Sequence, residues 1–343
     1  MVISPATTNP LLFAPILKHE DIVNGRLQKE ILSALKQYAF FYVVDIPGFD
    51  PAAEFEMMKT FFDLSQSLKE KYASVKHNAS STNVLRGYGL TRNCEGDPIE
   101  EVYNIGQYET RTMTPSEASC RAEYISREPN VWPNSGDFAS SKAFKETLQN
   151  AFTIRMELAR KLVDQIGSCM GYKGLLEKFE EGEFTSFYLK KYSARTRASN
   201  QHIYSPESSY SMESEDGREL CVPSHIDTTI TLLGIYSNGG LQALYKDTWY
   251  DVPPVSNSLL MMSGTLIEEL TDNKLPGLQH RVVDIKTERY STPFFFNPSF
   301  HADITTSFSG KATKAGRDYK TFGPWQVVQL HKDETLILNP TSL

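Results

Sequence analysis

The sequence predicts an α+β protein with a jelly-roll core flanked by helices, and two observations support this fold class. Apolar residues in the first half of the chain repeat mainly at helical spacing, whereas short β-branched and aromatic runs follow residue 183. Gly, Pro and Asn separate these later runs, as in sandwiches and barrels. A helix-rich half followed by a strand-rich half predicts a jelly roll wrapped by helices.

The N-terminal region, residues 1–183, is expected to be mostly helical and to pack on the core without folding independently. Leu27, Ile31 and Leu35 follow a helical period, and Asp50-Pro51 is a typical helix start. One strand is expected at 40–49, where the run FFYVVDIPGF ends in Pro-Gly.

Later in the N-terminal region we expect one irregular segment and one long helix. Residues 77–110 show no clear period and are expected to be irregular. A helix is expected over about 140–170, where Arg155 is a polar break in an apolar stripe.

The catalytic core is expected at 184–310, with a long Ser-rich loop at 193–222 that is either functional or disordered. A C-terminal helix and tail should occupy 311–343, because FGPWQVVQL is typical of a helix with Pro near its start. The strands of the core are expected at 184–192, 227–236, 240–245, 249–255, 258–264, 280–285 and 290–300.

Composition and charge limit the classes of partner. With 343 residues, 40% of them hydrophobic, the chain can bury a large core. A net charge of −7 without a basic stripe gives no reason to expect nucleic acid or a membrane surface. The 4 cysteines are widely spaced, which indicates neither a zinc knuckle nor a disulfide framework. No apolar run approaches the ~18 residues of a membrane span. We expect a cytoplasmic monomer or weak homodimer that binds a small molecule.

The stretch PSHIDTTITLL contains the first candidate metal ligands. On a strand, His225 and Asp227 would face the same side, with Ile226 pointing away. His280 begins a later apolar strand and is the favoured third ligand. Two histidines and a carboxylate on one face of an octahedron leave positions open, as in non-haem Fe(II) oxygenases.

Two other interpretations of this stretch stay open at this point. A histidine on a strand is often an ordinary hydrogen-bonded residue. If His225 is one, the chain could be a β-barrel binding protein without catalytic activity. A hydrolytic zinc site is the second, although no motif supplies its general base.

The motif RYS supplies a candidate carboxylate site. Arg289 and Ser291 stand at i and i+2 and would face the same way, offering a planar guanidinium fork and a hydroxyl donor. Beside an open-site metal, this pair suits a chelating keto acid such as 2-oxoglutarate. The alternative is a solvated turn in which Arg289 pairs with Glu288.

Together these motifs resemble the Fe(II)- and 2-oxoglutarate-dependent dioxygenase superfamily, in the branch with plant flavonoid oxygenases and isopenicillin N synthase. HID, GGLQAL, WYDVPPVSNSLLMMSG, LQHRVV and RYSTPFFFNPS stand in the family's order, and RGYG and NVWP match more loosely. The resemblance implies a double-stranded β-helix, Fe(II) held by His225, Asp227 and His280, and O2 as oxidant. It also implies that Arg289 and Ser291 bind the distal carboxylate of 2-oxoglutarate and that Tyr192 contacts the cosubstrate.

The same motifs also fit an iron oxidase that uses no 2-oxoglutarate, like isopenicillin N synthase, and they do not select the outcome among hydroxylation, desaturation and ring closure. Specialised-metabolite biosynthesis is the expected setting. Arg86 and Arg92 would suit a carboxylated substrate, although pairing with nearby acidic residues is equally compatible. The full set of expected substrate contacts is Arg86, Tyr88, Arg92, Tyr103, Phe296 and Phe300.

Overall fold

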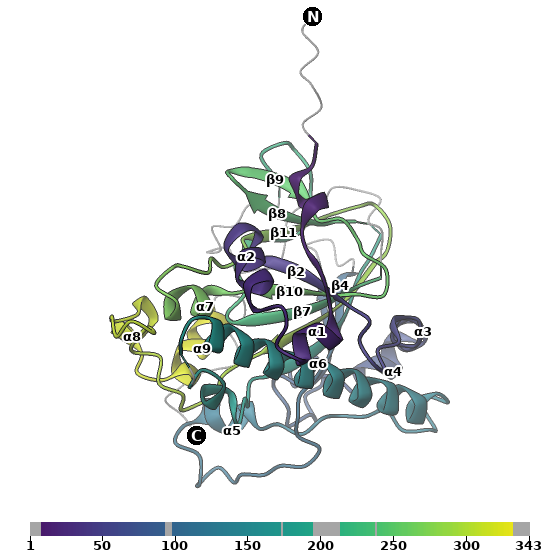
Figure 1. Cartoon of the computed structure of the whole chain (residues 1–343). Coiled ribbons are helices and arrows are strands. Elements are labelled where there is room, and N and C mark those ends of the chain that lie inside the picture. The colour runs from purple at the N-terminus through teal and green to yellow at the C-terminus, as the bar shows by residue number, and fades with distance from the viewer. Residues whose placement is uncertain (1–7, 93–97, 173, 195–212, 237–238, 332–343) are drawn as a thin grey trace, which may run out of the picture.

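The structure is a computed structural model that describes residues 8–92, 98–172, 174–194, 213–236 and 239–331. Two sheets face each other and helices cover the outer face of the larger one, which confirms the predicted jelly-roll α+β class (Figure 1). Within these ranges, no helix combines the length and the apolar character that crossing a bilayer requires.

The main sheet has eight strands in the order β1-β2-β10-β7-β12-β5-β4-β3. Neighbouring strands in this sheet are antiparallel, except that β1 and β2 are parallel. Its strands are β1 (Ile16–Lys18), β2 (Phe40–Val44), β3 (Gly87–Arg92), β4 (Pro98–Ile105), β5 (Ser186–Tyr192), β7 (Ile230–Ile235), β10 (Leu259–Ser263) and β12 (Arg289–Phe296).

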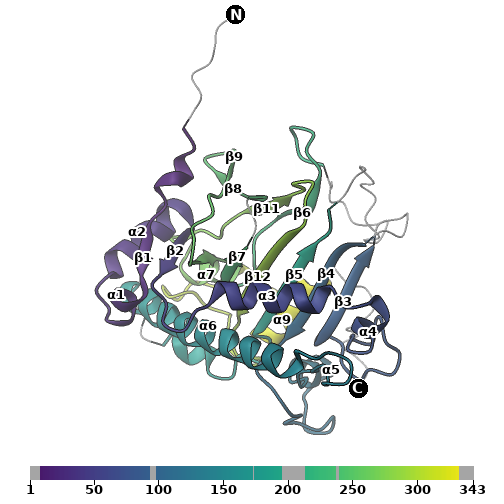
Figure 2. The ribbon, with the colours of Figure 1, turned by 90° about the vertical axis from the view of Figure 1, so that its right-hand side faces the viewer.

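The minor sheet has four strands in the order β6-β11-β8-β9 and lies over the inner face of the main sheet (Figure 2). Its strands are β6 (Leu220–His225), β8 (Leu241–Tyr245), β9 (Thr248–Asp251) and β11 (His280–Val283). An apolar core that includes Tyr192, Leu233 and Val282 fills the space between the sheets.

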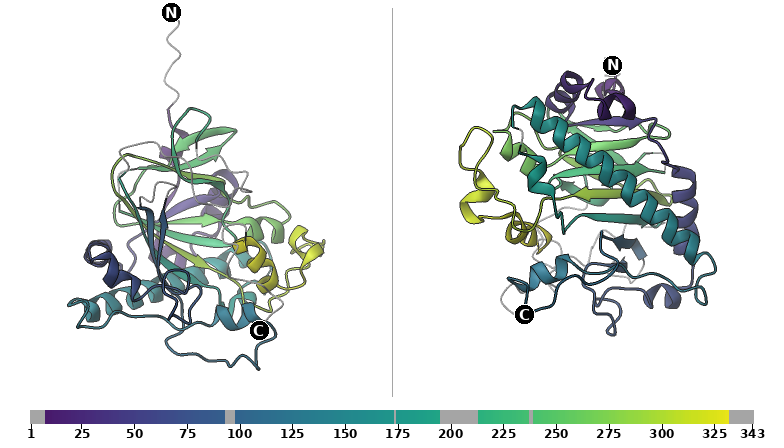
Figure 3. Two further views of the ribbon diagram at one scale, coloured as in Figure 1. Left: turned by 180° about the vertical axis from the view of Figure 1, so that it is seen from behind. Right: turned by 60° about the horizontal axis from the view of Figure 1, so that its bottom comes forward.

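Helices pack on the outer face of the main sheet. The long helix α6 crosses this face, with α1 and α2 at one end and α3 at the other (Figure 3). The helices are α1 (His19–Val23), α2 (Gln28–Tyr38), α3 (Pro51–Phe62), α4 (Gln66–Glu70), α5 (Arg121–Ser126), α6 (Ser141–Cys169), α7 (Thr265–Leu270), α8 (Lys314–Asp318) and α9 (Phe322–His331), with short 3-10 turns at Pro10–Phe13 and Leu176–Phe179.

Local chemistry explains where these elements begin and end. The Asp50 carboxylate accepts a 2.9 Å hydrogen bond from Ala53 N, and Pro51 is the first residue of α3. Strand alternation divides the aromatic run of β2, so that Phe41 joins the core under the helices and Phe40 the core between the sheets.

Two segments differ from the sequence predictions. The expected irregular segment at 77–110 instead contains the antiparallel pair β3 and β4, which extends the main sheet. Glycines and acidic residues obscure the alternating pattern of a strand in this segment. The preference of a residue for a strand depends on what its side chain packs against, and the local sequence does not show this. The expected loop at 193–222 ends in strand β6 from Leu220, and its residues 195–212 lie outside the described part of the chain.

Candidate metal centre and cosubstrate site

Three side chains that can bind a metal meet at the end of the minor sheet. His225 is the last residue of β6, and it stands opposite His280, the first residue of β11. Asp227 lies in the turn between β6 and β7. The prediction that His225 and Asp227 share one strand was therefore wrong, since the chain turns after His225, but the turn still brings the two side chains together.

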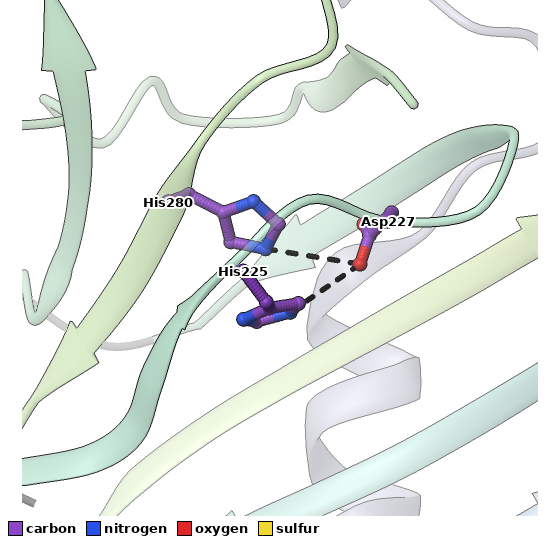
Figure 4. Close-up of side chains that lie close together, drawn as sticks. All are labelled: His225, Asp227 and His280. Atoms are coloured by element: carbon purple, nitrogen blue, oxygen red, sulfur yellow. Dashed lines mark ion pairs between the residues drawn. The ribbon is translucent and has the colours of Figure 1, made fainter. Parts of the chain in front are cut away.

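The ligand atoms of the three residues converge (Figure 4). Oδ1 of Asp227 lies 3.4 Å from Nε2 of His225 and 3.9 Å from Nε2 of His280. One ligand atom from each residue lies within 4.8 Å of the other two. The imidazole centroids are 4.3 Å apart, with the rings inclined at 53°. One ion could contact all three residues after small side-chain movements.

Backbone carbonyls set the tautomers of both histidines. Nδ1 of His225 donates to the carbonyl of Pro223 at 2.9 Å, and Nδ1 of His280 donates to that of Leu278 at 3.0 Å. Each hydrogen bond fixes the ring and leaves Nε2 as the lone-pair donor, an arrangement typical of metal-binding histidines.

The turn that carries Asp227 is also held in place. Thr231 Oγ1 donates to Asp227 Oδ2 at 2.5 Å, and Thr265 N, at the start of α7, donates to Asp227 O at 2.8 Å. Gly264 makes this contact possible, because a Cβ there would lie 2.5 Å from Asp227 O. Thr231 was not among the predicted site residues, although it lies only four residues after Asp227.

The charges of the three residues suit a cation. Burial alone would raise the pKa of Asp227, but the two neighbouring histidines and the Thr231 hydroxyl hold it well below its usual range. Burial, together with the neighbouring His225, lowers the pKa of His280 to about 4. Burial also lowers the pKa of His225, but Asp227 outweighs this effect and raises it. At neutral pH the site therefore combines an ionised carboxylate with a neutral His280.

This donor set fits Fe(II). Two imidazole nitrogens and one carboxylate oxygen, without a thiolate, form the facial arrangement of non-haem iron sites. A structural zinc site would be closed and usually rich in sulfur. His225, Asp227 and His280 would hold the iron, and positions for O2 and an organic ligand would stay open.

Arg289, Ser291 and Tyr192 lie together on the inner face of the main sheet. Arg289 stands opposite Tyr192, and its guanidinium carbon is 5.2 Å from the centre of that ring. Its Nη1 donates to Ser291 Oγ at 3.2 Å. Burial raises the pKa of Tyr192 to about 12, so the phenol remains a hydrogen-bond donor.

Arg289 is a buried cation that has no acidic partner among the residues the structure describes. It is 2% exposed, and Gly240 makes room for it, because a Cβ there would lie 3.1 Å from Nε. The interpretation of an Arg289–Glu288 surface pair is wrong, since Glu288 pairs with Lys191 at 3.1 Å. Arg289 also acts electrostatically on His280. A buried guanidinium of this kind suits an anionic ligand.

An ion pair that was not predicted lies on this same inner face. Lys190 stands opposite Ser291, and its Nζ lies 2.8 Å from Glu100 Oε1. Both side chains are mostly buried, at 22% and 16% exposure. Lys190 also acts electrostatically on His225. The alternation of β5 could have shown it, because Lys190 lies two residues before Tyr192.

The predicted aromatic substrate contacts lie elsewhere. Tyr88, Tyr103, Phe296 and Phe300 all belong to the core between the main sheet and the helices. Tyr103, for example, packs against Phe61 of α3 at a centroid distance of 4.7 Å. Strand alternation places Tyr88, Tyr103 and Phe296 on the outer side of the sheet, whereas Arg289 and Ser291 point inward. Phe300 lies after the end of β12 and packs against Phe184 at a centroid distance of 6.0 Å.

The two predicted arginines differ from each other. Arg86 is 0% exposed, and its guanidinium donates to Asn104 Oδ1 at 3.0 Å and to Ser186 Oγ at 2.9 Å. Arg86, which directly precedes β3, therefore links that strand to β4 and β5. Arg92 is partly buried at the end of β3, where the register with β4 shifts.

Comparisons with known proteins agree with this site. The family model of the 2OG-Fe(II) oxygenase superfamily matches residues 196–298. The model described as non-haem dioxygenase in morphine synthesis N-terminal matches residues 15–135. The two matches stand in the order expected for one such enzyme and cover both halves of the chain.

Individual relatives and solved structures extend over most of the chain. Isopenicillin N synthase from Amycolatopsis lactamdurans is 26% identical over 311 residues, which are 89% of this chain and 90% of that protein. The 2-oxoglutarate-dependent dioxygenase tropC from Talaromyces stipitatus is 24% identical over 289 residues, 82% of each chain. T7H from Neurospora crassa, solved with alpha-KG and 5-formyluracil, superposes with a TM-score of 0.67 at 22% identity and covers 96% of this chain and 99% of its own.

These matches favour the 2-oxoglutarate-dependent interpretation over an oxidase that works without the cosubstrate. A silent binding protein is disfavoured as well, since the three ligand side chains are all present and converge. The chain therefore belongs to the Fe(II)- and 2-oxoglutarate-dependent oxygenase superfamily, as a non-haem iron enzyme that acts on a small molecule.

Proposed function

We propose that His225, Asp227 and His280 bind Fe(II) and that Arg289, Ser291 and Tyr192 bind the distal carboxylate of 2-oxoglutarate. The observation that carries this proposal is the buried Arg289, which lies on the inner face of β12 and has no acidic partner among the described residues. A dicarboxylate would give it a counter-ion and leave the second carboxylate and the keto oxygen free for the metal.

Each side chain contributes a distinct physical role. The iron, 2-oxoglutarate and O2 together supply oxidation of a substrate C–H bond, coupled to conversion of the cosubstrate to succinate and CO2. Arg289 neutralises one carboxylate, while Ser291 and Tyr192 add hydroxyl donors of fixed direction. The apolar core between the sheets, with Leu233 and Val282, excludes water around these polar groups.

We further propose that the substrate carries an acidic group and that it belongs to specialised-metabolite biosynthesis. Lys190 supports the acidic group, because it lies on the inner face with Arg289 and Ser291 and already binds a carboxylate, that of Glu100. The metabolic setting is supported by relatives with biosynthetic names, such as isopenicillin N synthase. The net charge of −7 supports a small-molecule partner and not nucleic acid or a membrane. We also propose that the protein is cytoplasmic and is a monomer or weak homodimer.

The cosubstrate is tested first. The chain is reconstituted with Fe(II) without O2, 2-oxoglutarate is added, and the visible charge-transfer band of the chelate is recorded. Admission of O2 should then give succinate. If the folded chain shows neither the band nor succinate, the proposed residues do not form this site.

The substrate class is tested by a screen that pairs small organic acids with their methyl esters. Acids that increase succinate formation should lose this effect when esterified. Lys190→Met should weaken the response to the acid. Lys191→Met is the matched control, since Lys191 is the next residue on β5, points to the opposite face and also forms an ion pair. Equal responses to acids and esters would contradict the acidic substrate.

A further inference from the structure

A buried polar cluster lies under the main sheet, on the face opposite the cosubstrate residues. It consists of Glu54 on α3, Arg155 on α6, Tyr236 just after β7, and Thr292 on β12, and we refer to these four residues as the β12 clamp. Arg155 binds both oxygens of the Glu54 carboxylate, at 2.8 and 2.7 Å. Its Nη2 also donates to Thr292 Oγ1 at 3.1 Å.

Tyr236 closes the clamp on its other side. Its hydroxyl donates to the Glu54 carboxylate and lies 3.0 Å from Thr292 Oγ1. Burial, together with the Glu54 charge, raises the pKa of Tyr236 well above its usual value, so the hydroxyl keeps its proton. Gly234 leaves the necessary space, because a Cβ there would lie 2.4 Å from Thr292 Oγ1. The Thr292 hydroxyl therefore contacts Arg155 of α6 and Tyr236, and both of these bind Glu54 of α3.

Thr292 directly follows Ser291 on β12. Because side chains alternate along a strand, Thr292 points outward to the clamp while Arg289 and Ser291 point inward to the cosubstrate site. Any shift of the backbone at Thr292 would therefore move the two inward donors.

The backbone of β12 lacks one hydrogen-bond donor next to Thr292. Pro293 has no N–H, and proline is unusual inside a central strand such as β12. β12 is paired on both sides here: Thr292 stands opposite Gly234 and Pro293 opposite Leu233 of β7, and the register with β5 is the same at Ser291–Lys190 and at Phe294–Phe187. The clamp thus adds side-chain hydrogen bonds to β12 at the residue before its proline.

Stability alone is a weak explanation for the clamp. Arg155 and Thr292 are 0% exposed and Glu54 is 3% exposed. Removing such ions from water costs about as much as their attraction returns, so an apolar cluster of the same shape would often be as stable. A buried ion pair can instead define one geometry.

We propose that the β12 clamp is a positioning device for cosubstrate binding: by holding Thr292 from the outer face, it sets the depth and direction of Arg289 and Ser291 on the inner face. This inference rests on the proposed role of Arg289 and Ser291. Arg155, Glu54, Tyr236 and Thr292 act only through β12 and do not touch the cosubstrate.

The test compares two ligands in the anaerobic Fe(II) protein. 2-Oxoglutarate has the distal carboxylate, whereas 2-oxopentanoate has the same length and keto-acid end but lacks it. Thr292→Val keeps the side-chain shape and removes the hydroxyl. It should weaken binding of 2-oxoglutarate by about 5- to 10-fold, as expected for the loss of one buried hydrogen bond. Binding of 2-oxopentanoate and of Fe(II) should stay near wild type.

Three further variants make the result specific. Thr292→Ser keeps the hydroxyl and should restore 2-oxoglutarate binding. Tyr236→Phe should repeat the effect of Thr292→Val and serves if that variant fails to fold. Thr313→Val is the matched control, because Thr313 is 3% exposed, also donates through its hydroxyl and lies outside the jelly roll. It should lower stability without changing the ratio of the two ligand affinities.

The outcomes separate the two proposals. If Thr292→Val and Tyr236→Phe lose stability but bind 2-oxoglutarate like wild type, the clamp is structural only and the inference is wrong. The same holds if both ligands weaken equally, since the effect would then not act through Arg289 and Ser291. A folded wild-type protein that binds neither ligand overturns the proposed function, and this inference with it.

Discussion

Thr231 Oγ1 donates a 2.5 Å hydrogen bond to Asp227 Oδ2, and the other oxygen of that carboxylate faces Nε2 of both histidines. Partners that orient a metal-binding carboxylate typically change metal affinity by about 10- to 100-fold when removed. We therefore expect Thr231→Val to weaken Fe(II) binding by about 10-fold or more, measured by competition with a chelator. Thr313→Val provides the matched control, and equal iron affinity in both variants would show that Thr231 does not orient the ligand.

Removal of the carboxylate itself should abolish iron binding. Asp227→Ala leaves two imidazoles without the anion that offsets the charge of the metal, and we expect no iron after dialysis. Asp303→Ala changes an exposed aspartate that follows β12 and should retain iron. Iron content and succinate formation are measured in both, and full activity of Asp227→Ala would refute the site.

Arg289→Met should separate iron binding from cosubstrate binding. The buried guanidinium is lost while the three metal ligands stay in place, so iron content should be unchanged. Loss of a charge-assisted contact of this kind should raise the 2-oxoglutarate requirement by about 10- to 100-fold. The charge-transfer band during titration with the cosubstrate measures it, and an unchanged titration would place the distal carboxylate elsewhere.

Gly264→Ala should misplace Asp227 without touching any ligand. The added Cβ would lie 2.5 Å from both Asp227 O and Thr229 O, so the turn or the start of α7 must move. We expect a lower melting temperature together with weaker iron binding. Gly174→Ala is the control, since a Cβ there would lie 3.5 Å from Glu177 Oε2, an ordinary contact distance. Wild-type iron affinity in Gly264→Ala would show that the turn adapts.

We also expect that the jelly-roll region does not fold without the N-terminal region. β2 pairs with β10, and β4 pairs with β5. A fragment that begins at residue 184 would expose both strand edges and the outer apolar face. Circular dichroism and thermal unfolding of this fragment should show no cooperative transition, whereas a cooperative transition would establish an independent domain.

The sequence predicted those parts whose pattern is local. The β-branched and aromatic runs after residue 183 predicted the jelly roll, and Asp50-Pro51 predicted the start of α3. The motifs HID and RYS identified side chains that the structure indeed brings close to one another. Each of these predictions depended on residues only a few positions apart, or on motifs that stand in the same order as in the family.

The parts that could not be predicted depend on distant partners. Glu100 is a charged residue on the inner face of a strand. Its position there is explained by its ion pair with Lys190, which is 90 positions away in the sequence. Alternation along β3 and β4 shows that Tyr88 and Tyr103 share one face, but not that this face meets the helices. Arg155 looked like a break in an apolar stripe, because Glu54 and Thr292 lie on other elements.

The pairing of β2 with β10 also has a consequence during synthesis. Leu259 stands opposite Val43, so 259 − 43 = 216 positions separate the partners. A ribosome that adds about 5–20 residues per second leaves β2 without this neighbour for roughly 10–40 s. Five consecutive residues, Phe40–Val44, are apolar or aromatic, and such a run is prone to aggregate. The nascent chain must therefore shield β2, by early packing of α2 or by a chaperone, until β10 has emerged.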